Sequence, residues 1–161
     1  MQYAILLLSL ALASLPAMAD PPQYRHWTVN APAMCHPALL RFDSDVRKRP
    51  LAVVNEGSSS AFVTCSLQID MANAHGLETA YAVLQNYTGQ AQVVRCTGVY
   101  GADNGEQVYV ARTITIQAGQ RRMLELKAED FGLSGLHNRV GISCLLPVMV
   151  GVNEVGTEEK L

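Results

Sequence analysis

Four cysteines carry the most distinctive chemistry that this 161-residue sequence offers. They are Cys35, Cys65, Cys96 and Cys144, separated along the chain by 30, 31 and 48 residues. A zinc site normally uses close pairs such as C-x2-C, because a short loop brings two ligands together, and these gaps contain no such pair. A nucleophilic cysteine favours an electropositive, partly exposed position and would leave three other thiols over. An even number of widely spaced cysteines instead predicts two disulfides.

The residues around the cysteines support that interpretation. Cys65 lies in the alternating stretch "AFVTCSLQID", where Val63 and Leu67 share its parity, and Cys96 and Cys144 also share parity with apolar neighbours. Alternate residues of a strand point to opposite faces, so these cysteines are expected to face inward. The opposite parity is left for solvent or a partner, and in this stretch it comprises Thr64, Ser66, Gln68 and Asp70.

Three disulfide connectivities are open to four cysteines. Bridges Cys35–Cys65 and Cys96–Cys144 are preferred here because segments that follow one another in a chain usually lie side by side.

Other groups with catalytic or metal-binding potential are scattered. His26, His36, His75 and His137 form no H-x-x-x-H or H-E-x-x-H arrangement, and no G-x-S-x-G motif marks a serine nucleophile. The acidic residues that could pair as in a glycosidase are expected to form a solvated rim: Asp70, Glu78, Asp103, Glu106, Glu125 and Asp130. The segment Asp103–Glu106 could offer oxygen ligands to Ca²⁺, but it lacks the 12-residue loop pattern, and a hairpin turn is favoured. We therefore predict no catalytic residue, no cofactor and no metal ligand.

Three further sequence features could form binding or modification sites on the surface. Arg47-Lys48-Arg49 before Pro50 is predicted to be a solvated loop, with use as a partner contact as the alternative. Asn86-Tyr87-Thr88 matches the N-glycosylation acceptor pattern. Sugar-binding modules usually present a row of exposed aromatic rings, and one tryptophan with six tyrosines offers little material for such a row.

Short runs of alternating or β-branched residues, separated by Gly, Asn, Asp, Ser and Pro, recur along the chain and predict an all-β domain. The fold class expected is a two-sheet antiparallel β-sandwich, jelly-roll or Ig-like, because each half-buried face needs another sheet to cover it. Hairpins are predicted at Asn104-Gly105 and at residues 118–120, a single helical turn at residues 127–133, and ragged ends at residues 21–22 and 156–161. The expected strands are residues 26–30, 38–42, 51–55, 61–69, 79–85, 92–100, 107–117, 121–126, 139–146 and 149–154.

A weak internal repeat relates two of these segments. Asn55 precedes Cys65 by ten residues, and Asn86 precedes Cys96 by ten, each with a Gly-containing turn between. A duplicated hairpin would explain the match, although recurrence of ordinary β-sandwich sequence patterns is the favoured explanation.

The first residues predict export. An apolar run from Ala4 to Leu15 is followed by Ala17-Met18-Ala19, a pattern that signal peptidase recognises, so residues 1–19 are expected to be a signal peptide. Residues 20–161 then form a single domain, secreted or periplasmic, with no membrane association after cleavage. The net charge of −2 suggests no nucleic-acid partner.

The segments "CHPALLRF", "VVNEGSSSAFVTCSL", "VVRCTGVYG" and "VGISCLLP", with the exported start, resemble those of small secreted bacterial proteins of unassigned function. Those proteins carry four spaced cysteines in β-strands and a Cys-x-x-Pro-like ending, here Cys144 to Pro147. The resemblance implies a disulfide-stabilised β-sandwich and transfers no active site.

The leading functional hypothesis is a non-catalytic exported domain that binds a surface, a polysaccharide or another protein. One alternative is a secreted hydrolase that uses Asp or Glu in loop clusters at one end of the sandwich. Another is a protein-interaction or inhibitor module that uses residues 47–50 or 102–106 as its contact.

Overall fold

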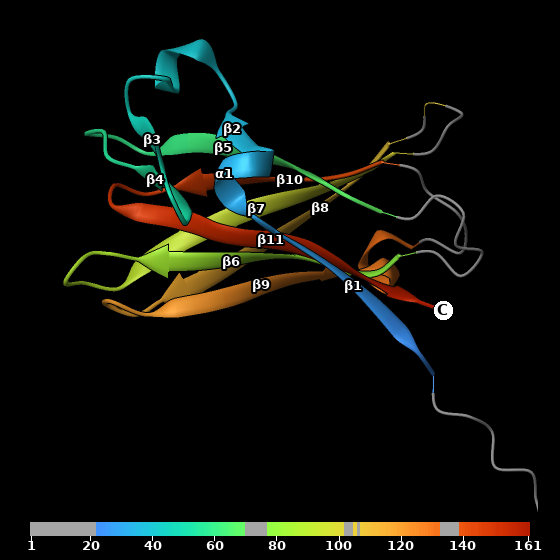
Figure 1. The fold of residues 1–161 in the computed structure, drawn as a ribbon. Coiled ribbons are helices and arrows are strands. Elements are labelled where there is room, and N and C mark those ends of the chain that lie inside the picture. The colour runs from blue at the N-terminus through green and yellow to red at the C-terminus, as the bar shows by residue number, and fades with distance from the viewer. Residues whose placement is uncertain (1–21, 70–76, 102–104, 106, 133–138) are drawn as a thin grey trace, which may run out of the picture.

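In the part of the chain that the computed structural model describes, eleven strands pair into two antiparallel sheets that pack face to face (Figure 1). The structure describes residues 22–69, 77–101, 105, 107–132 and 139–161. The predicted all-β sandwich with two disulfides is confirmed. The elements are β1 (Tyr24–Asn30), α1 (Ala31–Met34), β2 (Cys35–Pro37), η1 (Leu40–Phe42), β3 (Val46–Arg49), β4 (Ala52–Asn55), β5 (Ala61–Leu67), β6 (Leu77–Asn86), β7 (Gln92–Gly101), β8 (Gln107–Ile116), β9 (Arg121–Lys127), η2 (Ala128–Phe131), β10 (Arg139–Leu146) and β11 (Val150–Lys160).

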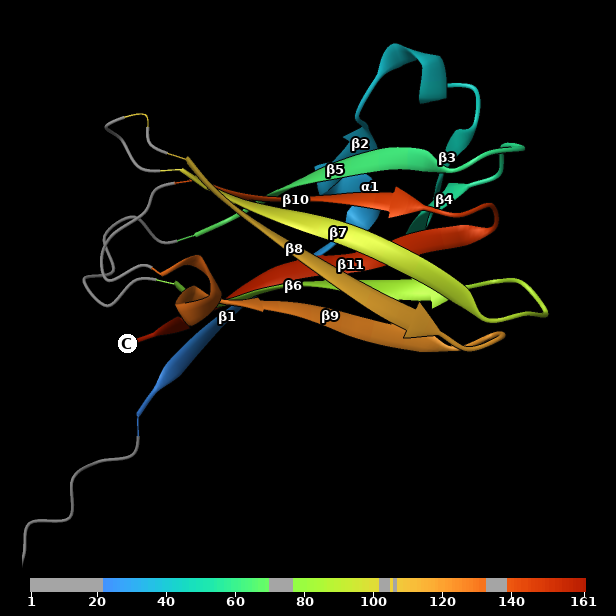
Figure 2. The ribbon, with the colours of Figure 1, turned by 180° about the vertical axis from the view of Figure 1, so that it is seen from behind.

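We call the six-stranded sheet sheet A and the five-stranded one sheet B. Sheet A has the order β3-β4-β11-β6-β9, with β1 also paired to β11, and sheet B has the order β2-β5-β10-β7-β8. Sheet B faces the viewer in Figure 2, where β8 crosses in front of the strands of sheet A. The core lies between the sheets and is filled by inward residues of both, among them Leu84, Leu126, Ile116, Ile142 and Leu146.

Four connections pass from one sheet to the other at the same end of the sandwich, on the left in Figure 1. They join β4 to β5, β6 to β7, β8 to β9 and β10 to β11. The turn predicted at residues 118–120 is present, with Gly119 at φ 70° and Gln120 N donating to the Gln117 carbonyl. The predicted hairpin is wrong, however, because β8 pairs in sheet B while β9 pairs in sheet A.

Two buried asparagines hold two of these connections in the same way. Asn55 ends β4 and donates from Nδ2 to the carbonyls of Ser59 and Leu146, both at 2.8 Å. Asn86 ends β6 and donates to the carbonyls of Gln90 at 2.7 Å and Ile116 at 3.0 Å. Leu146 and Ile116 are the last residues of β10 and β8, so each amide links the end of a sheet A strand to the end of a sheet B strand. Neither unit of the sequence repeat is a hairpin, and what the two share is this link.

Two sequence expectations about strand positions in the first third of the chain are wrong. Residues 38–42 contain no strand: η1 occupies residues 40–42 after the short strand β2, with Phe42 buried as the anchor of the turn while Leu39 and Leu40 face solvent. The basic segment predicted as a loop is strand β3, whose backbone pairs with β4 while its charged side chains stay exposed. Edge strands commonly carry charged side chains. A strand of this kind therefore has the same residue composition as a solvated loop, and the sequence does not distinguish the two.

The predicted ragged end at residues 156–161 belongs to β11. This strand continues to Lys160 and pairs with β1 on one side and with β6 on the other. Thr157 and Glu159 are buried there, and Thr157 Oγ1 donates to the Gln68 carbonyl at 2.7 Å. Tertiary pairing therefore orders a charged segment that has no strand signal of its own.

Two glycines of β11 allow tyrosine rings to lie against the outer face of sheet A. A Cβ at Gly151 would be 3.2 Å from Cε2 of Tyr87, and a Cβ at Gly156 would overlap the Tyr81 ring and the Trp27 carbonyl. The Tyr81 hydroxyl also hydrogen-bonds to the Thr28 hydroxyl of β1. The tyrosine rings can approach the β11 main chain this closely because glycine has no side chain at these two positions.

Candidate binding pocket

A pocket of about 460 Å³ opens on the outer face of sheet A, near the end where the chain crosses between the sheets. The β3–β4 hairpin supplies one wall, and the residues just after β6 and just before β11 supply the other. Its volume is in the range of small-ligand sites, and its lining is mainly apolar with a few polar groups. The lining residues are Arg49, Pro50, Leu51, Ala52, Val54, Glu56, Tyr87, Met149 and Asn153.

The turn between β10 and β11 fixes the wall that contains Met149. Its backbone N–H donates to the Asn55 carbonyl at 2.7 Å, and its carbonyl accepts from the Tyr87 N–H at 2.9 Å. Met149 has φ 58°, the left-handed region that non-glycine residues seldom adopt. These two hydrogen bonds hold the strained residue in place, so its side chain enters the pocket from a fixed backbone.

Asn153 lies at an irregularity of β11, where the register with β6 shifts between Val152 and Glu154. It is 6% exposed, and its Nδ2 donates to the Leu51 carbonyl at 3.3 Å and to the Tyr87 hydroxyl at 3.2 Å. Within the described part of the chain, its Oδ1 accepts no hydrogen bond. The bulge therefore places a buried amide oxygen with unused acceptor capacity on a residue that lines the pocket.

Arg49 and Glu56 form the charged part of the lining. Arg49 Nε donates to Glu56 Oε1 at 2.7 Å, and Arg49 Nη2 donates to Oε2 at 2.6 Å, which is a bidentate pair. The two side chains come from β3 and from the residue after β4, so the pair joins the two strands of the hairpin. Their charges cancel, and the pocket presents no net charge from this pair.

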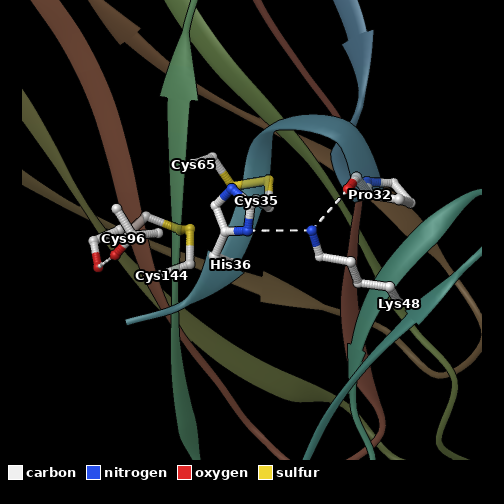
Figure 3. The surroundings of a disulfide bond; sticks show 9 residues. Pro32, Cys35, His36, Lys48, Cys65, Cys96 and Cys144 are labelled. Carbon is white, nitrogen blue, oxygen red and sulfur yellow. Dashed lines mark hydrogen bonds between the residues drawn. A yellow bond between two sulfur atoms is a disulfide. The ribbon is translucent and has the colours of Figure 1, made fainter. Parts of the chain in front are cut away.

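The predicted contact segment 47–50 is split by the structure. Arg49 and Pro50 line the pocket, whereas Lys48 lies on the other side of β3, where Nζ donates to the Pro32 carbonyl at 3.0 Å and lies 3.2 Å from His36 Nδ1 (Figure 3). The other proposed contact segment, 102–106, lies outside the described residues except for Gly105.

The four cysteines form two bridges inside sheet B. Cys35–Cys65 joins β2 to β5, and Cys96–Cys144 joins β7 to β10, with Cα atoms 4.0 Å apart in each pair. All four are buried on the inward face, and Figure 3 shows the two bridges close together. Cys65 lies opposite Ile142 and Cys144 lies opposite Val63, so the bridges are diagonal neighbours across β5 and β10. They join strands within one sheet, while the facing sheet is held by packing and by the asparagine links.

The remaining predicted groups do not converge on the pocket. His26 lies on β1 with Nδ1 3.8 Å from Glu158 Oε2, His36 lies on β2 beside Lys48, and His75 and His137 lie outside the described residues. Asp130 pairs with Arg112 and accepts from the Lys127 N–H at 3.0 Å.

Glu78 lines a separate polar depression with Lys127 and Glu158. Glu125 is an exposed residue of β9. Asp70, Asp103 and Glu106, and with them the Ca²⁺ alternative, lie outside the described residues. Among the residues that are described, no group of three or more His, Cys, Asp or Glu side chains is arranged to hold a metal ion.

The glycosylation pattern at Asn86-Tyr87-Thr88 coincides with a structural asparagine. Asn86 has no exposed surface, its Nδ2 is engaged with main-chain carbonyls, and its Oδ1 accepts from Thr88 N–H and Oγ1. A glycan on this nitrogen is incompatible with the folded domain.

Burial also changes the acidity of one tyrosine in the core. The pKa of Tyr100 is raised to about 12, first by burial of its hydroxyl and second by the nearby charge of Glu159. This tyrosine lies in the core and packs against Phe131, so it belongs to the interior rather than to the pocket.

Sequence reasoning missed most of the pocket. Leu51, Met149 and Asn153 have no motif that marks them, and only the spatial meeting of a hairpin, a turn and a bulge brings them together. The single signal that pointed here was the basic segment before Pro50.

Comparison with protein-family models and with curated proteins finds no match. Among solved structures, a family 11 carbohydrate-binding module from Clostridium thermocellum aligns with a TM-score of 0.42 and 11% identity, over 83% of this chain and 87% of that one. A disulfide-linked pilus protein of Bacillus endospore appendages aligns with a TM-score of 0.32 and 14% identity, over 92% and 99%.

The N-terminal CBM22-1-GH10 modules of xylanase 10B from Clostridium thermocellum align with a TM-score of 0.45 and 16% identity over 68% of this chain, which spans 21% of that one. The β-sandwich assignment rests on the strand pairing of the present chain, and the similarities transfer no ligand to it.

Proposed function

We propose that this protein is a non-catalytic binding domain that acts outside the cytoplasm and holds its ligand in the pocket on the outer face of sheet A. The observation that carries the proposal is the pocket itself, a concave and mainly apolar site with fixed walls and a small set of polar groups. Two disulfides support an oxidising compartment. Among the described helices, none has the length and apolar character needed to cross a membrane.

The chemistry of the lining supports binding rather than turnover. The carboxylate of Glu56 and the guanidinium of Arg49 are engaged with each other in a bidentate pair. A general acid or base must instead be within reach of the proton that it transfers. The other polar groups are an amide and a phenol, which orient a ligand through hydrogen bonds.

The test compares two exposed leucines. Leu51 is 67% exposed at the mouth of the pocket, and Leu40 is 88% exposed on η1, outside the lining. The purified domain and the variants Leu51→Asp and Leu40→Asp are applied to arrays of glycans and of peptides. We expect binding that Leu51→Asp removes and Leu40→Asp preserves, because a carboxylate at residue 51 places an unpaired charge on the apolar wall.

Two outcomes contradict the proposal. Binding that both variants retain equally would place the ligand site elsewhere on the molecule. Turnover of a generic hydrolase substrate by a domain that binds nothing on either array would support the enzyme alternative.

A further inference from the structure

We infer that the pocket on the outer face of sheet A takes a neutral saccharide ring, an inference that rests on the binding function proposed above. Three features of the lining argue for this ligand class: a fixed aromatic ring, a buried amide oxygen that lacks a donor, and a charge-neutral Arg–Glu pair.

The aromatic ring is that of Tyr87. One part of the ring lies against Gly151 of β11, and its hydroxyl accepts from Asn153 Nδ2 at 3.2 Å. The residue nevertheless remains 40% exposed. Because the ring is held from one side and at its hydroxyl, it offers a ligand contact area at little cost in conformational entropy. The apolar face of a sugar ring suits such a platform.

The amide oxygen is Asn153 Oδ1. It is buried in a residue that lines the pocket, and no described group donates to it. A buried acceptor without a donor is unfavourable, so a ligand hydroxyl that reaches this oxygen when the Asn153 side chain turns toward the pocket relieves an existing cost. A purely apolar ligand would leave this oxygen unsatisfied and would also remove water from the charged pair of Arg49 and Glu56.

The Arg49–Glu56 pair argues for a neutral ligand. Each charge already has its partner at 2.6 to 2.7 Å, so neither an anionic nor a cationic ligand finds an uncompensated charge. Hydroxyl groups both donate and accept, and they can add to such a pair without breaking it. A ring with an apolar face and a hydroxyl-bearing edge, carrying no charge, satisfies the three features together.

The experiment titrates the intact domain with neutral tetrasaccharides of glucose, mannose, galactose and N-acetylglucosamine, and in parallel with a tetrasaccharide of galacturonate. Binding is followed by calorimetry and by backbone amide NMR. We expect at least one neutral tetrasaccharide to bind, with shifts centred on residues 49–56, 87 and 149–153. Raising the salt concentration should leave its affinity nearly unchanged, and the galacturonate should bind no more tightly.

Variants separate stacking from hydrogen bonding. Tyr87→Ala should weaken saccharide binding about tenfold or more, since an aromatic contact of this kind commonly has that weight. Tyr109→Ala is the matched control, because Tyr109 is 62% exposed on β8 of sheet B. Asn153→Leu should weaken saccharide binding while strengthening the binding of apolar peptides from an array, because it replaces the amide with a hydrocarbon of similar size.

The outcomes distinguish the inference from the function on which it rests. Peptide binding at the pocket without saccharide binding would overturn the saccharide inference and leave the binding function in place. Binding of neither class by the wild-type domain would overturn both. Saccharide shifts centred away from the pocket in the wild-type spectrum would overturn the site, whether or not the variants fold.

Discussion

Two asparagines, Asn55 and Asn86, use their buried side-chain amides to connect separate parts of the main chain. Asn55 and Asn86 have no exposed surface, and each uses its amide to connect main-chain carbonyls from different parts of the chain. Each also accepts from the turn that follows it, at Gly57 N–H and Thr88 N–H respectively. A side chain with both a donor and an acceptor is needed for this, which explains why the same residue type stands at both positions.

Replacement of Asn86 by alanine should lower the free energy of unfolding by about 2 kcal/mol or more, because it leaves buried carbonyls without their donor. Urea unfolding of both proteins measures the difference. Asn30→Ala is the control, since Asn30 is exposed and its side chain caps no helix, and we expect a change within about 0.5 kcal/mol. Equal stability of Asn86→Ala and the wild type would show that the link between the sheets contributes nothing.

Strand β11 is the element on which most of sheet A depends. It pairs with β1, β4 and β6, contains the glycines against which Tyr81 and Tyr87 lie, and contributes Asn153 to the pocket. The position of the site therefore follows from the irregularity of this strand as much as from the pocket walls. Its second half is charged, which is why sequence patterns ended the strand too early.

A Gly156→Ala substitution should destabilise the domain by about 1 to 3 kcal/mol, the cost typical of overpacking. The new methyl group would overlap the Trp27 carbonyl, a main-chain atom that can move only with β1. Gly89→Ala tests whether any glycine change has this effect, since nothing lies within 4 Å of a Cβ there. Thermal unfolding measures the melting temperatures of the two variants, and we expect that of Gly156→Ala to be lower. Similar melting temperatures would contradict this account of β11.

At the scale of the whole molecule, the covalent links join strands within one sheet, whereas the asparagine hydrogen bonds join one sheet to the other. Both disulfides join strands inside sheet B, whereas sheet A has no cysteine among its described strands. Cys96–Cys144 joins the central strands β7 and β10, and Cys35–Cys65 fastens the short edge strand β2.

Peptide mapping of the oxidised protein under non-reducing conditions should recover Cys35 linked to Cys65 and Cys96 linked to Cys144. Removal of the second bridge by Cys96→Ala with Cys144→Ala should cost about 4 kcal/mol in the chain-entropy model for the sequence separation of 48. The Cys35→Ala, Cys65→Ala pair provides the comparison, with a slightly smaller cost for its separation of 30. A peptide that links Cys65 to Cys144 would contradict the arrangement of sheet B.

The sequence by itself determined the fold class and the environment of the cysteines. Alternation around Cys65 and Cys144 predicts strands with inward cysteines, because strand parity is a local property that needs no knowledge of partners. Turn chemistry likewise predicted the change of direction at Gly119. What such local signals omit is which strands pair, so the turn at residues 118–120 was expected to close a hairpin when it joins two sheets.

Only the tertiary structure decided the pocket. Arg49, Tyr87 and Asn153 belong to three segments widely separated in the sequence, and each has an ordinary local context. Their meeting depends on strand order, on a register shift in β11 and on a turn in which Met149 donates to the Asn55 carbonyl and accepts from the Tyr87 N–H. These relations join residues that are far apart in the sequence, and the local spacing of residue types contains no information about them. This is the physical reason why the sequence predicted the β-sandwich but did not predict the pocket.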